Sequence, residues 1–71
     1  MALNLEMTHL GHVHRFNVAL ASTRGWDVRE DQDATVLFEA HRNSWSRVEL
    51  DMERFNSRAR WLSQRGWTEQ T

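Results

Sequence analysis

Cysteine and proline are absent from this sequence of 71 residues, and so are lysine, isoleucine and tyrosine. Without cysteine, the chain can form neither disulfide bonds nor thiolate metal sites. A chain of this length buries only about 60% of the surface that it exposes when unfolded, and such a core seldom supplies more than about 3–5 kcal/mol. We therefore expect a single small domain over residues 1–71. Self-association is expected to add to its stability.

Long apolar runs are absent too, since the longest hold three or four residues, as in Val36-Leu37-Phe38. A helix that crosses a bilayer needs about 20 apolar residues, so we expect no membrane partner. A secretory signal has a basic segment followed by an apolar stretch. The beginning of this sequence does not show that pattern. These absences predict a cytoplasmic protein.

Charge of one sign is not in excess, because nine arginines stand against ten acidic residues and the formal net charge is −1. Such a chain has no overall field that attracts polyanions, so nucleic acid would require a local basic patch. The three glycines are isolated, and no linker or low-complexity tract marks a domain boundary. We expect the chain to fold as one unit.

The clearest helical pattern lies in the C-terminal third. Four apolar residues recur at intervals of three, four and three positions: Met52, Phe55, Ala59 and Leu62. This spacing places them on one stripe of a helix. Asp51 is a suitable N-cap, and Gly66 is a suitable C-terminal stop. The sequence therefore predicts a helix over residues 52–65.

A second apolar pattern, nearer the N-terminus, fits two conformations. Leu10, Val13, Phe16 and Leu20 have helical spacing, whereas Phe16, Val18 and Leu20 alternate as in a strand. Because Arg24-Gly25 repeats the Arg65-Gly66 ending of the surer helix, we predict a helix over residues 8–24. Gly11 opposes this interpretation, since glycine costs about 1 kcal/mol inside a helix.

Three strands are predicted between the two helices. Residues 26–29 and 34–40 alternate on either side of an acidic turn over residues 30–33, which indicates a hairpin. Residues 48–52 alternate again and lead into the Asp51 cap. The predicted fold class is α+β, in the order α-β-β-β-α, with an antiparallel three-stranded sheet and two helices packed on one face.

An alternative start of the last helix stays open. Trp45 and Val48 extend the apolar stripe backwards in heptad spacing, and Ser46 with Glu49 matches a capping box. In this alternative the helix begins near Trp45, and only the hairpin remains of the sheet. Trp26 and Trp67, which follow the two helix-ending glycines, are interpreted as packing residues at the edge of the core.

Two clusters of possible metal ligands have a simpler interpretation. His9, His12 and His14 do not converge in either a helix or a strand, and zinc requires about four convergent ligands. The acidic residues between Glu30 and Asp33 lack the glycine and the bidentate glutamate of a calcium loop. No nucleophile elbow, phosphate loop or metalloprotease helix is present. We therefore expect no metal, no cofactor and no enzymatic activity.

A second row on the C-terminal helix combines arginine with tryptophan. Its members are Arg54, Arg58, Trp61 and Arg65. At about 100° per residue, the row lies roughly 90–135° from the centre of the apolar stripe, so Trp61 projects from the solvent side. One interpretation is a local cation–π pair worth about 0.5–1 kcal/mol. The other is a partner-binding surface, because tryptophan and arginine are enriched at binding hot spots.

These observations predict a small, non-enzymatic protein–protein interaction or regulatory module whose partner is a second copy or another protein. The alternative is a nucleic-acid-binding domain that uses the arginines of the C-terminal helix. The α-β-β-β-α order resembles that of the double-stranded-RNA-binding domain, in topology alone. That family presents a basic cluster at the start of its last helix, whereas this helix starts with Asp51-Met-Glu53-Arg54.

Overall fold

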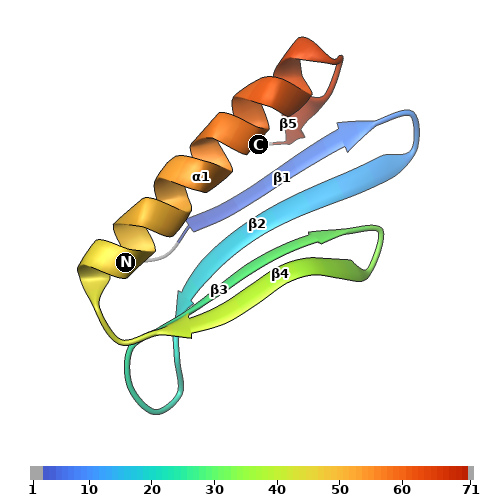
Figure 1. Cartoon of the computed structure of the whole chain (residues 1–71). Helices are drawn as coiled ribbons and strands as arrows, with labels where there is room; N and C mark the ends of the chain where they lie inside the picture. The colour runs from blue at the N-terminus through green and yellow to red at the C-terminus, as the bar shows by residue number, and fades with distance from the viewer. Residues whose placement is uncertain (1–2, 71) are drawn as a thin grey trace.

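The first four elements of the chain are consecutive antiparallel strands, as a computed structural model that describes residues 3–70 shows (Figure 1). They are β1 (Leu3–His9), β2 (His12–Leu20), β3 (Trp26–Gln32) and β4 (Thr35–Arg42). Helix α1 (Trp45–Gln64) and the short strand β5 (Thr68–Gln70) follow. Because β5 pairs with β1, the strand order is β4-β3-β2-β1-β5, and every pairing is antiparallel.

The chain is a small α+β domain, but the predicted α-β-β-β-α order is wrong. The described residues form five strands and a single helix, so the topological resemblance to the double-stranded-RNA-binding domain is lost with that order. Residues 8–24, predicted as a helix, contain the end of β1, a tight turn and β2. Leu10 and Gly11 both have positive φ, 50° and 82°. Such a pair is typical of a two-residue hairpin turn, and it cannot lie inside a right-handed helix.

The third predicted strand, over residues 48–52, is also wrong, and the alternative start at Trp45 is confirmed. Asp51 is a buried residue within α1 and not its N-cap. The N-cap is Ser44, whose side chain makes no capping hydrogen bond, and Ser46 with Glu49 therefore forms no capping box. Continuous heptad spacing from Trp45 to Leu62 outweighed the short alternation over residues 48–52.

The predicted stop at Gly66 is confirmed. Gly66 has a φ of 98°, and its N–H donates to the carbonyl of Ser63 at 3.2 Å, while the N–H of Trp67 donates to the carbonyl of Leu62 at 3.1 Å. These two hydrogen bonds form a Schellman motif. The motif turns the chain back toward the sheet, where β5 pairs with β1.

The predicted hairpin is confirmed, but its turn lies further along the chain. Asp33 and Ala34 occupy the turn, with φ values of 50° and 70°. Glu30 and Asp31, expected in a solvated turn, lie within β3 and are buried. The pairing of β3 with β4 is interrupted by a bulge at Leu37, between the partners of Glu30 and Asp31.

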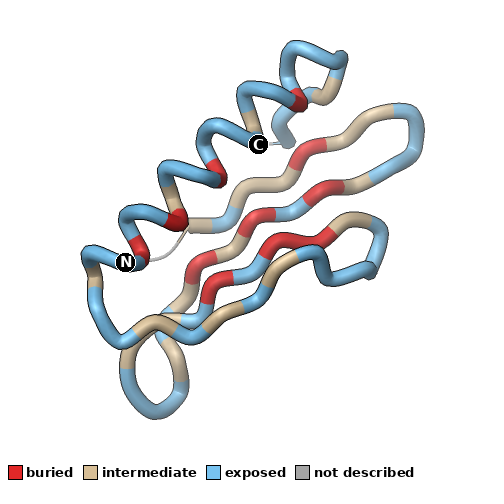
Figure 2. The backbone as a smooth tube through the Cα atoms, in the orientation of Figure 1, coloured by how far each residue is buried: buried red, intermediate tan, exposed pale blue. Residues whose placement is uncertain are grey.

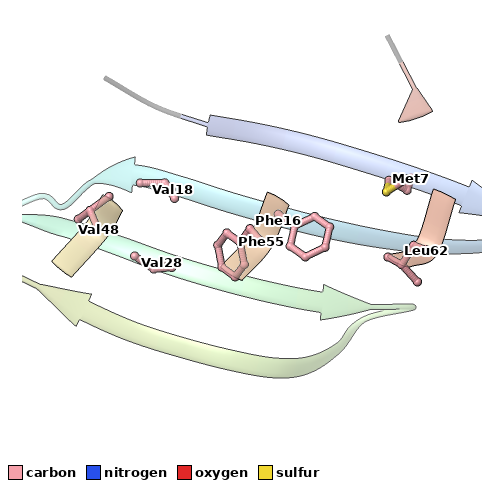
Figure 3. Close-up of a cluster of buried hydrophobic side chains, with 7 residues drawn as sticks. All are labelled: Met7, Phe16, Val18, Val28, Val48, Phe55 and Leu62. Carbon is pink, nitrogen blue, oxygen red and sulfur yellow. The ribbon is translucent and has the colours of Figure 1, made fainter. Parts of the chain in front are cut away.

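The core lies between α1 and one face of the sheet, where buried positions alternate along the strands (Figure 2). Seven apolar side chains form it: Met7, Phe16, Val18, Val28, Val48, Phe55 and Leu62. The rings of Phe16 and Phe55 lie 5.0 Å apart, which joins β2 to the middle of the helix (Figure 3). Trp26 and Trp67 pack against this cluster as partly buried residues, as predicted.

Helix α1 lies along one face of the sheet (Figure 1). It begins three residues after the end of β4, and the turn after its last residue leads into β5 on the far side of β1. At the other side of the sheet, β4 is the terminal strand. Its Phe38 lies beside the flank of the helix that carries Arg54. Within residues 3–70, no helix has both the length and the apolar content that a membrane span requires.

Candidate partner-binding surface

The four predicted site residues lie together on one flank of α1, where Arg54 contacts Phe38 of β4, Arg58 contacts Glu30 of β3, and Arg58 and Arg65 both contact Trp61. Arg54, Arg58, Trp61 and Arg65 are all exposed. Two further arginines, Arg42 at the end of β4 and Arg47 in the first turn of α1, lie on the same side. We call these six residues the arginine flank. Five of the nine arginines of the chain therefore lie on one side of the molecule.

Trp61 lies beneath two of these arginines. The guanidinium carbon of Arg65 is 4.1 Å from the centre of the indole, and that of Arg58 is 5.0 Å from it. Trp61 remains 43% exposed, because its place on the helix is turned away from the core. The structure thus forms the local cation–π contact, and partner binding by Trp61 stays a prediction.

Phe38 on β4 is a second aromatic ring that lies beneath two arginines. The guanidinium carbon of Arg54 is 4.0 Å from the centre of the Phe38 ring, and that of Arg42 is 5.8 Å from it. Arginine stacks on aromatic faces while its edge keeps donors for carboxylates. Arg54 is therefore held over β4 with part of its guanidinium edge directed to solvent.

Arg42 is fixed by a buried carboxylate. Its Nε donates to Oδ2 of Asp51 at 2.9 Å, and its Nη2 donates to Oδ1 at 3.2 Å. The hydrogen bonds to Asp51 raise the pKa of Arg42 above its ordinary value. This bidentate pair joins the end of β4 to α1 and gives the buried carboxylate of Asp51 its partner.

Two adjacent hollows lie along the arginine flank. One, of about 380 Å³, is lined by Glu30, Leu37, Phe38, Arg54 and Arg58. The other, of about 290 Å³, is lined by Arg42, Arg47, Leu50, Asp51 and Arg54. Because Arg54 contributes to both, the hollows follow one another between α1 and β4. The two carboxylates that line them are already engaged, Asp51 with Arg42 and Glu30 with His14.

The three N-terminal histidines lie in separate environments. His12 contacts Asp33, with Nδ1 2.6 Å from Oδ2, and His9 packs against Trp67. His14 is fully buried, with its Nε2 2.7 Å from Oε2 of Glu30. In the part of the chain that the structure describes, no three His, Asp or Glu side chains gather as a metal cluster.

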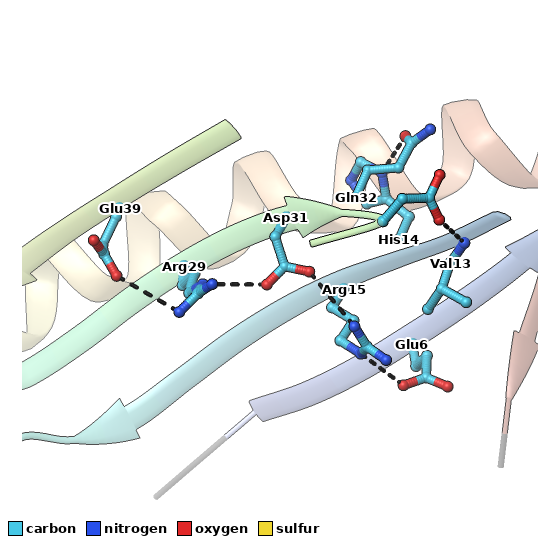
Figure 4. A network of polar contacts seen from close by, with 9 residues as sticks. Glu6, Val13, His14, Arg15, Arg29, Asp31, Gln32 and Glu39 are labelled. Carbon is cyan, nitrogen blue, oxygen red and sulfur yellow. Dashed lines mark hydrogen bonds and ion pairs between the residues drawn. The ribbon is translucent and has the colours of Figure 1, made fainter. Parts of the chain in front are cut away.

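A row of ion pairs that the sequence did not indicate lies on the face of the sheet opposite the helix (Figure 4). Arg15 contacts Glu6 at 2.9 Å and Asp31 at 3.9 Å, and Arg29 contacts Asp31 at 3.1 Å and Glu39 at 3.9 Å. The row runs across four strands, so no spacing within one segment indicates it. The exposed pairs of such a row contribute little to stability. Asp31 at its centre is buried, and its Oδ1 has no hydrogen-bond partner among the described residues.

Comparison with protein-family models, with curated proteins and with solved structures finds no match to this chain. Its functional interpretation therefore depends on the geometry of the arginine flank.

Proposed function

We propose that this protein is a non-enzymatic module that binds an acidic protein partner through the arginine flank. The observation that carries the proposal is the concentration of positive charge on one side of a chain whose net charge is −1. Arg42 is anchored by Asp51 and Arg54 lies over Phe38, so these donors are held in place before a partner arrives. Arginine presents a planar fork of donors that matches carboxylates.

Charge also argues for a distinct partner over a second copy at this surface. Two copies that met flank to flank would bring arginines against arginines, and like charges in contact oppose association. Asp51 and Glu30 offer little compensation, because each is buried and already paired. The self-association expected from the sequence stays a prediction that would involve another surface.

Nucleic acid is the second candidate, because α1 presents Arg47, Arg54, Arg58 and Arg65 on one side. At about 1.5 Å per residue, the row is roughly 27 Å long. Binding to single strands generally adds base stacking on exposed aromatic rings. Here Phe38 and Trp61 already lie under arginines, which favours a protein ligand.

Fluorescence anisotropy with three labelled probes tests the proposal. The probes are a decaglutamate peptide, a decalysine peptide and a single-stranded DNA of about 20 nucleotides, at about 150 mM salt, where the Debye length is about 8 Å. We expect decaglutamate to bind and decalysine not to bind. Arg54→Glu should weaken decaglutamate binding by about tenfold or more, because it places a like charge beneath the peptide.

Arg60→Glu is the matched control. Arg60 is exposed on the same helix but lines its other side with Leu3 and Leu5, above β1. Because Arg60 lies outside the arginine flank, Arg60→Glu should leave the affinity for decaglutamate within about twofold of that of the unsubstituted chain. The proposal fails if Arg60→Glu weakens binding as much as Arg54→Glu does, or if DNA binds more tightly than decaglutamate.

A further inference from the structure

The two edges of the sheet differ in how open they are. On one side the sheet ends in β5, which has three residues, and on the other it ends in β4, which has eight. Very short edge strands, lysine, proline and bulges are common means of protecting an edge. Of these, β4 has only a bulge, near its start. The bulge at Leu37 leaves a regular segment over residues 38–42, paired with β3 on one side. No described strand pairs with its other side.

We propose that the partner of the arginine flank is an extended acidic segment that adds to β4 as a sixth strand. This inference rests on the proposed function and specifies the form of the ligand. Strand addition supplies affinity through main-chain hydrogen bonds and specificity through alternate side chains. Here the open edge of β4 would supply the main-chain hydrogen bonds, and the arginine flank beside it would select acidic side chains.

The register of β4 determines which face of the added strand is acidic. Phe38, Ala40 and Arg42 lie opposite Glu30, Val28 and Trp26, on the side of the sheet that α1 covers. Every second side chain of an added strand would stand beside these three residues, on the face of the sheet where α1 lies. The stacking of Arg54 on Phe38 brings a helix arginine to this face, with its guanidinium carbon 4.0 Å from the centre of the Phe38 ring. Carboxylates at alternate positions would therefore meet both Arg42 and Arg54.

The other face of the added strand meets a different environment. Glu39 and His41 point away from the helix, opposite Arg29 and Asp27. Glu39 is already in contact with Arg29, and His41 with Asp27. Because these charges are satisfied in pairs, this face favours uncharged side chains. The ligand is thus acidic at alternate positions only.

The bulged end of β4 adds an apolar feature. Val36 is 44% exposed and Leu37 is 50% exposed, and Leu37 lines the larger of the two hollows of the flank beside Phe38. A strand that ran antiparallel to β4 would bring its C-terminal end to these residues. We therefore expect an apolar residue there, after the alternating carboxylates.

A second copy of the chain fits this edge less well. Its own β4 would bring another Arg42 and another arginine flank to a surface that already carries five arginines. Repulsion between these charges opposes a continuous sheet of two copies. An acidic strand removes that repulsion, and this difference decides between the two occupants.

The test uses a probe peptide, Glu-Thr-Glu-Thr-Glu-Thr-Val, with blocked ends. Its first matched control carries an N-methyl group on every backbone amide, which removes the main-chain donors and retains every side chain. Its second control is the reversed sequence, which has the same composition. We expect the probe to bind, the N-methylated form to bind at least about tenfold more weakly, a loss of about 1.4 kcal/mol, and the reversed form to bind more weakly than the probe. Hydrogen exchange should show new protection of β4 amides over residues 38–42 on binding.

The outcomes separate this inference from the proposed function. If the N-methylated probe binds as well as the probe while Arg54→Glu still abolishes binding, strand addition is wrong and the proposed function stands. If neither peptide binds and Arg54→Glu has no effect on decaglutamate, the proposed function itself fails. A dimer in light scattering whose β4 amides are protected without peptide, and which the probe does not dissociate, would identify a second copy as the occupant and overturn the inference.

Discussion

The imidazole of His14 contacts the carboxylate of Glu30 inside the core, with 2.7 Å between Nε2 and Oε2. The side chain of His14 is fully buried, and that of Glu30 is 10% exposed. The Nδ1 of His14 lies 2.9 Å from Oε1 of Gln32, and Arg58 reaches the same Glu30 oxygen at 3.4 Å. A buried polar network thus extends from β2 to the arginine flank.

Breaking this pair should destabilise the fold strongly. Glu30→Leu or His14→Leu removes the 2.7 Å contact and leaves the other side chain buried with only its second contact, to Gln32 for His14 or to Arg58 for Glu30. Losing one partner of a buried polar group costs about 1–3 kcal/mol. The double variant should unfold at a higher urea concentration than either single variant, because it removes both polar groups together. Urea denaturation of the four proteins measures this coupling. Additive single effects would show that the contact contributes little.

The two tight turns offer stabilising substitutions. Leu10, at a φ of 50°, and Ala34, at a φ of 70°, occupy a left-handed conformation that costs most L-residues about 1–2 kcal/mol. Leu10→Asn and Ala34→Gly introduce the residues that such turns prefer. Each should therefore raise the free energy of unfolding by about 0.5–1 kcal/mol, measured by thermal melts. Leu20→Asn is a control, because Leu20 is exposed but lies in β2, and it should not stabilise the chain.

The same residues explain how far the sequence predicted the fold. The apolar stripe from Met52 to Leu62 is periodic over one continuous segment, so its spacing alone predicted the helix. β2 was missed because the Arg24-Gly25 ending was given more weight than the alternation of Phe16, Val18 and Leu20. His14, a polar residue at a core position, also kept this alternation from extending toward the start of the strand. Likewise, Glu30 and Asp31 are acidic residues at buried positions of β3, so the sequence of this strand resembled that of an exposed turn. Such residues are stabilised by partners from other elements, and a single segment does not reveal them.

The candidate surface was predicted in part for the same reason. Arg54, Arg58, Trp61 and Arg65 follow one another along one helix, so their shared side was predictable from about 100° per residue. Arg42 and Phe38 join them only because β4 ends the sheet beside α1. The open edge of β4 depends on strand order, which the sequence did not indicate.

The pair of His41 and Asp27 predicts a pH dependence. His41 Nδ1 lies 2.9 Å from Oδ1 of Asp27, and its Nε2 lies 3.1 Å from Oδ1 of Asn43. The hydrogen bond to Asp27, and then that to Asn43, raises the pKa of His41 above its ordinary value. Because the protonated form is favoured in the folded state, its stabilising contribution is complete below the ordinary pKa of about 6.5. The contribution disappears as the pH rises through the higher folded value.

Titration of the imidazole signals by NMR measures this shift. In Asp27→Asn, the pKa of His41 should fall toward its ordinary value, because the charged partner is removed. An unchanged His41 titration in Asp27→Asn would contradict the assignment of Asp27 as the main cause.

Trp61→Ala separates a binding role of the indole from a purely local one. Trp61 is 43% exposed and does not belong to the buried core, so the substitution should leave the circular dichroism spectrum unchanged. The loss of its contacts with Arg58 and Arg65 should cost less than about 1 kcal/mol of stability. If Trp61 anchors a partner, decaglutamate binding should nevertheless weaken by about tenfold or more, as for a hot-spot residue.

Trp61→Phe supplies the matched control for this experiment. A phenyl ring retains a face for Arg65, 4.1 Å above the indole, and should preserve most of the orientation of the arginines. Binding that is lost in Trp61→Ala and largely retained in Trp61→Phe would show that the ring acts by holding the guanidinium groups. Binding that is lost in both would show that the indole itself contacts the ligand. Unchanged binding in both variants would remove Trp61 from the partner-binding surface and leave the arginines alone to carry it.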